Sequence, residues 1–226
     1  MNKSFFQCFW VSVSPSRRAL AWQVACGVGV LTCGSVGAQT APAFQWAVSG
    51  GAADDETVAG VATDAAGNVY AMGTFTNTTT FGVSSFTTAG GSDIFLAKYA
   101  SNGVMQWLMQ FGGPGNDVAR AITANPVGSV FIVGSFETTA AFGATTLTSA
   151  GDVDAFMARL ETTAGNVIWA ASASGTGEDR AVGIHGGFNL GVVGEFNGTP
   201  TFGGATVGRI TTLTSAGAQD VFGWVL

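Results

Sequence analysis

Two segments of this chain carry nearly the same sequence as two later segments. Residues 67–75 read GNVYAMGTF and residues 128–136 read GSVFIVGSF. Residues 87–95 read TTAGGSDIF and residues 148–156 read TSAGDVDAF. Both matches keep the same order and the same interval along the chain, which indicates an internal structural repeat.

Single residues extend this repeat to a third unit. Trp46, Trp107 and Trp169 recur at nearly equal intervals. A glycine, a Phe-Gly pair and an aspartate recur with them, at Gly73, Gly134 and Gly194, at Phe81, Phe142 and Phe202, and at Asp93, Asp154 and Asp220. The repeat predicts one domain over residues 39–226, with units of approximately residues 44–106, 107–168 and 169–226.

Each unit has the pattern of β-strands. In the second unit, residues 155–160 alternate, so Phe156, Ala158 and Leu160 share one face of a strand. A turn-rich stretch, residues 163–166, leads from this strand to the apolar residues 167–170. We expect four antiparallel strands per unit, and a loop or a short extra hairpin around each Phe-Gly pair. No segment keeps the 3.6-residue period of a helix, so the sequence predicts an all-β protein.

Four-stranded antiparallel units with glycine turns and a fixed aromatic residue are typical of propeller blades. A β-solenoid is the alternative, although its repeats are usually shorter. Three units are fewer than the four to eight blades of closed propellers. We therefore expect either an incomplete propeller, as a fragment or remnant of a longer array, or a ring closed by oligomerisation. A homodimer would supply six blades, and its closure would use strands expected at residues 44–46 and after Asp220.

The repeat resembles a known family. Residues 67–70, Gly-Asn-Val-Tyr, and residues 93–98, Asp-Ile-Phe-Leu-Ala-Lys, are similar to the pattern of the bacterial seven-bladed beta-propeller repeat (SBBP repeat). The resemblance covers residues 44–222. It implies a propeller fold in a secreted or surface protein, a role as a scaffold or interaction module, and no catalytic motif.

Residues 1–38 have the pattern of a secretory signal peptide. Lys3, Arg17 and Arg18 precede an apolar stretch, residues 19–37, and small residues surround a cleavage site after Ala38. A membrane anchor is the alternative, but the stretch is short and rich in glycine. All three cysteines, Cys8, Cys26 and Cys33, lie within this leader. The mature chain is therefore expected to lack thiols and membrane spans, and to reside in the periplasm, at the cell surface or outside the cell.

The amino-acid composition of the chain argues against some classes of function. The 226 residues include 8 Lys and Arg against 14 Asp and Glu, with a net charge of −6. This acidic balance argues against a nucleic-acid partner, because basic groups supply most of that affinity. The single histidine, His185, leaves little room for histidine catalysis.

Two sets of acidic residues recur once per unit. Glu56, Asp117 and Asp179 follow the glycine turns and are candidates for ligand binding, with calcium as a candidate ion because it prefers oxygen ligands. The alternative is that they are solvated loop carboxylates. We interpret Asp93, Asp154 and Asp220 as structural residues that cap the turn before a strand, with a ligand collar as the alternative. No catalytic residue, metal ligand or other cofactor is assigned.

These observations predict an exported, non-catalytic scaffold that presents loops to a protein or glycan. One alternative is a propeller-type carbohydrate-active enzyme, a glycosidase or lyase, which needs acidic residues unique to one unit, such as Glu195. The other alternative is a truncated remnant of a longer repeat array.

Overall fold

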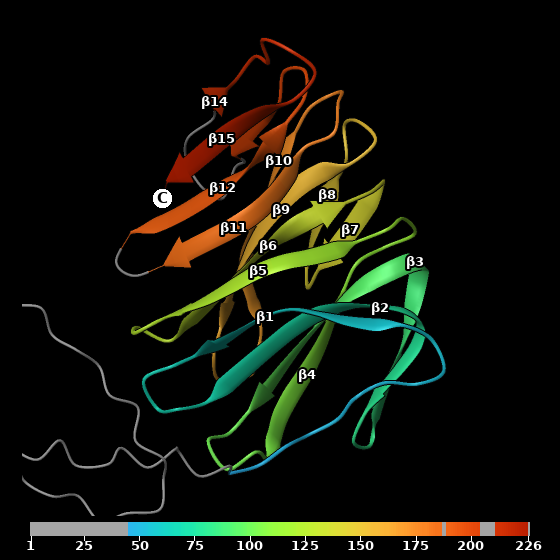
Figure 1. Cartoon of the computed structure of the whole chain (residues 1–226), viewed down its shortest axis with the longest axis vertical. Helices are drawn as coiled ribbons and strands as arrows, with labels where there is room; N and C mark the ends of the chain where they lie inside the picture. Colours follow the sequence, from blue (N-terminus) through green and yellow to red (C-terminus); the bar gives the residue numbers. More distant parts are fainter. Residues whose placement is uncertain (1–44, 187–188, 204–210, 226) are drawn as a thin grey trace, which may run out of the picture. The chain divides into compact units, whose positions relative to one another are not determined.

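The computed structural model describes residues 45–186, 189–203 and 211–225, and the predicted signal peptide, residues 1–38, lies outside them. The described residues form fifteen strands and no helix, which confirms the prediction of an all-β protein (Figure 1). Accordingly, this part of the chain has no helix that is long and apolar enough to cross a membrane.

The strands form three main antiparallel layers. The first sheet contains, in spatial order, β1 (Glu56–Thr63), β2 (Val69–Phe81), β3 (Ser84–Tyr99) and β4 (Met105–Phe111). The second sheet has the same order in β5 (Val118–Asn125), β6 (Ser129–Phe136), β9 (Asp154–Glu161) and β10 (Val167–Ser174). The third sheet contains β11 (Arg180–Gly186), β12 (Leu190–Phe196) and β15 (Asp220–Val225).

Extra hairpins follow the second strand of each sheet, as the sequence predicts. The ends of β2 and β3 pair beyond the rest of the first sheet, and β7 (Thr139–Phe142) pairs with β8 (Thr145–Thr148). In the third case β13 (Thr201–Gly203) pairs with β14 (Thr211–Thr212) on one side and with β10 on the other. Each sheet begins after a glycine turn, so the unit boundaries at Trp107 and Trp169 fall within β4 and β10.

A bulge in the first strand of each sheet explains the recurring glycine opposite it. The pairing shifts between Val58 and Gly60, between Ala119 and Ala121, and between Ala181 and Gly183. The glycines in the facing strand are Gly73, Gly134 and Gly194. A Cβ on any of them would collide with a backbone carbonyl oxygen of the bulged strand. These positions therefore exclude every larger residue.

Two hydrophobic cores lie between the three sheets. Phe156, Ala158 and Leu160 of β9 face the core shared with the first sheet, as their alternation predicts. Ala155 and Met157 of the same strand face the core shared with the third sheet. The second sheet is consequently buried on both faces.

The first strands of the three sheets are neighbours. β5 contacts β1 on one side and β11 on the other, and Figure 1 shows β5 running between them. The three sheets contact one another along β1, β5 and β11, and their remaining strands pack face to face.

The prediction of a strand at residues 44–46 is wrong for residues 45 and 46, and residue 44 lies outside the described residues. Residues 45–49 lie outside any strand, and only Gly50 forms an isolated bridge, with Phe81. Trp46 is nevertheless held, because its indole Nε1 donates a hydrogen bond to the carbonyl oxygen of Ser101 at 2.9 Å. Among the described residues this segment has no neighbouring third strand with which to pair, and a strand does not form without one.

Candidate functional site

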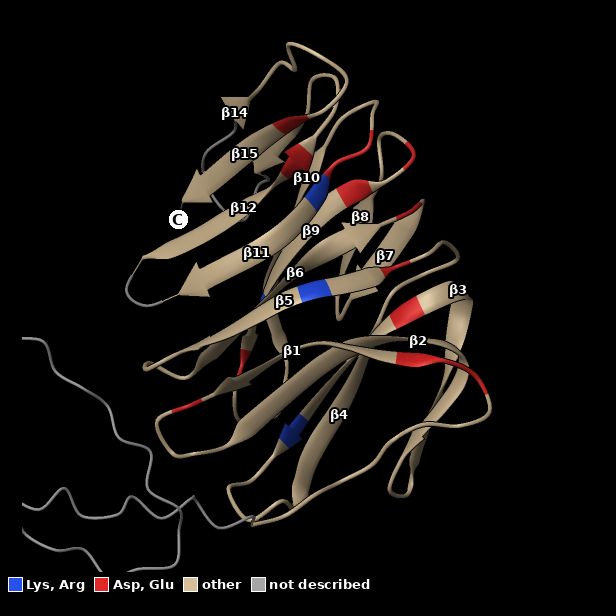
Figure 2. Ribbon diagram, in the orientation of Figure 1, with Lys and Arg blue, Asp and Glu red and all other residues tan. Residues whose placement is uncertain are grey.

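The recurring acidic residues gather at one end of the sheets. In an antiparallel sheet the first and third strands run in the same direction, so both begin at the same end. Glu56 begins β1, Asp117 and Asp179 immediately precede β5 and β11, and Asp154 and Asp220 begin β9 and β15. Figure 2 shows acidic segments at these strand ends.

Asp93 and Asp117 face each other where the first and second sheets meet. A Cβ on Gly112 would lie 2.5 Å from Asp93 Oδ1 and 2.8 Å from Asp117 Oδ2, so both carboxylates converge on this glycine. The amide of Gly113 donates a hydrogen bond to Asp117 Oδ2 at 2.7 Å. The side chain of Gln110 donates to Asp93 Oδ2 at 2.6 Å.

Asp154 and Asp179 form the equivalent pair between the second and third sheets. The amide of Gly175 donates to Asp154 Oδ1 at 3.2 Å, and the amide of Asn197 donates to Asp179 Oδ1 at 3.3 Å. A Cβ on Gly175 would lie 3.2 Å from Asp179 Oδ2. The turn between β10 and β11 therefore holds a second pair of buried carboxyl groups.

Burial raises the pKa of one carboxyl group in each pair. Asp117 and Asp179 are fully buried, so the interpretation as solvated loop carboxylates is wrong for both. Burial, reinforced by the charge of Asp93, raises the pKa of Asp117 to about 7. Burial and the neighbouring Asp154 likewise raise the pKa of Asp179 to about 7. These two carboxyl groups therefore hold a proton at a higher pH than an exposed aspartate does.

Several buried carboxyl oxygens have no hydrogen-bond partner in the described structure. They are Asp93 Oδ1, Asp117 Oδ1 and Asp179 Oδ2. A buried carboxyl oxygen without a donor disfavours the charged form of its group, in agreement with the raised pKa values of Asp117 and Asp179. In the described part of the chain, no group of three or more His, Cys, Asp or Glu side chains is arranged to hold a metal ion.

Glu56 and Asp220 occupy the outer ends of this series and are half-buried. The amide of Ala52 donates to Glu56 Oε1 at 3.1 Å, just as Gly113 donates to Asp117. The amide of Ala216 donates to Asp220 Oδ2 at 2.6 Å. Among the described residues, neither carboxylate has a neighbouring sheet beyond it. The six recurring acidic residues thus form two pairs and two single ends, and they do not form one cluster.

The three structural aspartates share the same turn. Each accepts a hydrogen bond from the amide four residues earlier, which is Ala89 for Asp93 and Ala150 for Asp154, at 3.1 and 2.6 Å. Hydrogen bonds of this kind are what the interpretation as turn-capping residues predicts.

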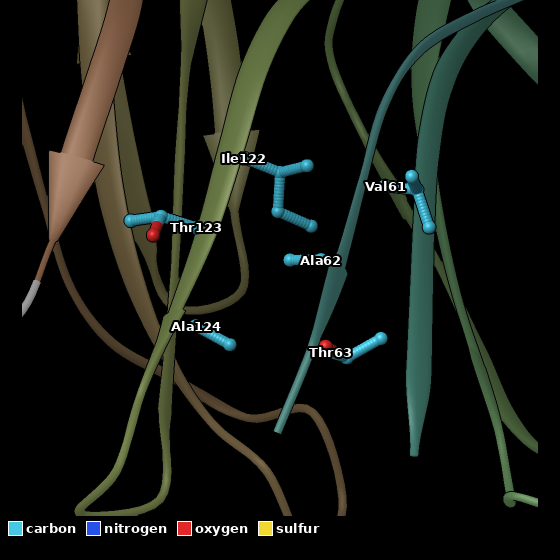
Figure 3. Close-up of a pocket in the computed structure, with 6 residues that line it drawn as sticks. All are labelled: Val61, Ala62, Thr63, Ile122, Thr123 and Ala124. Atoms are coloured by element: carbon cyan, nitrogen blue, oxygen red, sulfur yellow. The ribbon is translucent and has the colours of Figure 1, made fainter. Parts of the chain in front are cut away.

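A separate hollow of about 380 Å³ lies between β1 and β5, at the ends of these strands opposite the carboxylates. Its lining is apolar or hydroxylated and consists of Val61, Ala62, Thr63, Ile122, Thr123 and Ala124. Figure 3 shows Ile122 and Ala124 pointing from β5 toward β1, whereas Thr123 points the other way. Apolar side chains with a few hydroxyl groups suit contact with an apolar or sugar surface.

Sequence reasoning missed Gln110 and the close approach at Gly112. The available signal was the equal interval from Gly51 to Glu56 and from Gly112 to Asp117, directly after an aromatic segment. A carboxylate at this interval folds back and accepts a hydrogen bond from an amide of the glycine turn before it.

The fold and site define an all-β protein of packed antiparallel sheets, with buried carboxyl pairs at the sheet boundaries. No family model matches the chain, and no curated protein has a significantly similar sequence.

Proposed function

We propose that the protein is an exported, non-catalytic binding scaffold of propeller type, in which the three sheets are successive blades that present their loops to a protein or glycan. The observation that carries this proposal is the contact of β5 with both β1 and β11. In a propeller the first strands of successive blades surround the axis side by side.

The sheet topology supports the same proposal. The first and second sheets share one strand order, and each places an extra hairpin after its second strand. The resemblance of residues 67–70 and 93–98 to the SBBP repeat agrees with this arrangement. Export rests on the leader-like residues 1–38.

The roles of the acidic residues support binding over catalysis. The carboxyl groups of Asp117 and Asp179 are buried between sheets, where a substrate does not reach them. Those of Asp93 and Asp154 accept hydrogen bonds from turn amides. The recurring carboxylates thus serve the framework and leave the loops and the hollow between β1 and β5 for a ligand.

The test uses the exported protein and a panel of purified polysaccharides. We expect retention in affinity electrophoresis without release of new reducing ends. Ala62→Lys, whose side chain points from β1 into the hollow (Figure 3), should weaken retention, whereas Thr146→Lys, at an exposed residue of β8, should not.

An enzyme would give a different result. Glu195 is acidic where the first and second sheets have Thr74 and Ser135, and its Oε2 accepts a hydrogen bond from Gln219 at 3.0 Å. Release of reducing ends that disappears in Glu195→Ala would replace the scaffold with a carbohydrate-active enzyme.

A further inference from the structure

We propose that the open face of the first sheet and the open face of the third sheet are two halves of one interface, through which copies of this chain associate head to tail. This inference rests on sheet packing and does not depend on the proposed ligand binding. The chain itself makes the same kind of contact twice, between its first and second sheets and between its second and third sheets.

Backbone bonds define this internal contact. The amide of Asp117 donates to the carbonyl oxygen of Ser92 at 2.8 Å, and the amide of Asp179 donates to that of Val153 at 2.7 Å. At each boundary, the residue before a structural aspartate therefore accepts a backbone hydrogen bond from the buried acidic residue that precedes the first strand of the next sheet. The corresponding residues at the two outer ends are Gln219 and Glu56.

The open face of the first sheet carries residues whose counterparts are buried. Val58 is 72% exposed, whereas its counterparts Ala119 and Ala181 are buried against the preceding sheet. Val61 is 65% exposed, whereas its counterpart Ile122 packs into the core between the first two sheets. This face therefore has the form of one that packs on a preceding sheet.

The open face of the third sheet is the complementary half. Val221 is 80% exposed, whereas its counterpart Ile94 is fully buried against the second sheet. Val193 is 54% exposed, whereas its counterpart Met72 is fully buried in the same core. Exposed valines on two opposite outer faces are the apolar surface that association would cover.

A glycine in the turn before β15 also points to a missing neighbour. A Cβ on Gly90 would collide with the backbone of Pro114, and a Cβ on Gly151 would lie 2.6 Å from the carbonyl oxygen of Gly175. Both glycines are needed because the next sheet approaches closely. Their counterpart Gly217 has nothing within 4 Å of the same position. Within the described structure Gly217 has no packing reason to be glycine, but a neighbouring copy would supply one.

The segment before the first sheet fits the same contact. Trp46 donates to the carbonyl oxygen of Ser101 as Trp107 of β4 donates to that of Thr162 in the next sheet, at 2.9 and 3.3 Å. Residues 45–50 therefore lie where the fourth strand of a preceding sheet would run. In the described residues β15 pairs with β12 alone, so its other edge is available to this segment of a second copy.

The proposed interface would also pair the two acidic residues that have no partner sheet in the described structure. Asp220 of one copy would meet Glu56 of the next, as Asp93 meets Asp117. A head-to-tail contact closes into a ring when the rotation allows, and otherwise forms longer assemblies. The third sheet has Gly191 and Gly223 where the second sheet has Phe131 and Met157, so less apolar area is buried. We therefore expect association that depends on protein concentration.

Cysteine cross-linking tests the pairing directly. The full chain is first freed of its native thiols by Cys8→Ser, Cys26→Ser and Cys33→Ser. Ser92 and Asn116 bridge the internal boundary as neighbours, and Gln219 and Asp55 are their counterparts at the outer ends. The internal pair, Ser92→Cys with Asn116→Cys, is the matched control and should form an intramolecular disulfide.

The decisive experiment mixes two single-cysteine chains, one with Asp55→Cys and one with Gln219→Cys. We expect the oxidised mixture to give about tenfold more covalent dimer than either chain alone, because only the mixture brings the two thiols together. Adding Val221→Lys to the Gln219→Cys chain should abolish this dimer, whereas Val127→Lys, an exposed turn residue, should not.

Light scattering over a range of concentrations gives the second readout. We expect the mass to rise above that of a monomer and to return to it in Val221→Lys. Equal cross-linking of each single-cysteine chain with itself would overturn the head-to-tail arrangement. A monomeric mass at every concentration, with the internal control disulfide formed, would overturn the interface altogether.

Discussion

Replacing Asp117 with asparagine should stabilise the protein at alkaline pH. Burial and the charge of Asp93 raise the pKa of Asp117 to about 7, whereas the unfolded chain has about 3.9. A group whose folded pKa is raised contributes stability that is fully present below pH 4 and is lost as the pH rises through 7. Asparagine has the same shape, can still accept the hydrogen bond from Gly113, and is never charged.

The magnitude follows from the same two pKa values. A difference of about 3 corresponds to about 4 kcal/mol, at about 1.36 kcal/mol per pH unit. Relaxation around the ionised group raises the effective dielectric constant, so we expect a gain of about 1–2 kcal/mol in the free energy of unfolding at pH 8. At pH 4 the two proteins should agree within about 0.5 kcal/mol, because Asp117 is then protonated.

Urea denaturation followed by tryptophan fluorescence at several pH values between 4 and 8 measures this effect. Asp54→Asn, at an exposed position, is the control and should leave the pH profile unchanged. A loss of stability in Asp117→Asn that is the same at every pH would refute the reasoning. That result would mean that folding does not raise the pKa of Asp117.

The other predictions concern the second carboxyl pair, a bulge glycine and an indole. Asp179→Asn should raise stability at pH 8 by a similar amount, and combining it with Asp117→Asn should give the sum in the same denaturation assay, because the two pairs lie at different sheet boundaries. Gly134→Ala should lower the free energy of unfolding by about 2–4 kcal/mol, since its Cβ collides with a backbone carbonyl, whereas Gly191→Ala, with open space around it, should change it by less than about 1 kcal/mol. Trp107→Phe should cost about 1 kcal/mol in urea unfolding, because the indole loses its hydrogen bond to the next sheet.

The strands and their faces follow from local features of the sequence. The alternation in residues 155–160 assigns Phe156 and Met157 to opposite faces, and each is buried in a different core. Period-two alternation and glycine turns act over a few residues, so they can be recognised without knowledge of the fold. The recurrence of Gly134 is also visible, although its cause, a carbonyl oxygen of the neighbouring strand, requires the pairing register.

The carboxyl pairs could not be predicted in the same way. Asp93 and Asp117 are distant in the sequence and belong to different sheets, so their proximity depends on how two sheets pack. The sequence identifies each as a recurring acidic residue but does not indicate that one faces the other. The expected strand at residues 44–46 fails for a related reason, because a strand forms only where a partner strand is present.

The buried acidic residues have a role that apolar residues could not fill. The amides of Gly113 and Ala89 lie in tight turns at the first sheet boundary, and the carboxyl groups of Asp117 and Asp93 accept hydrogen bonds from them. Gly113 is buried, and a buried amide without an acceptor costs about as much as a lost hydrogen bond, so an apolar side chain in place of Asp117 would leave that cost unrelieved. The convergence of both carboxyl groups on Gly112 then fixes one turn against the next sheet. Holding this register accounts for a hydrogen-bond-accepting side chain at every boundary, although ionisation of Asp117 and Asp179 lowers stability near neutral pH.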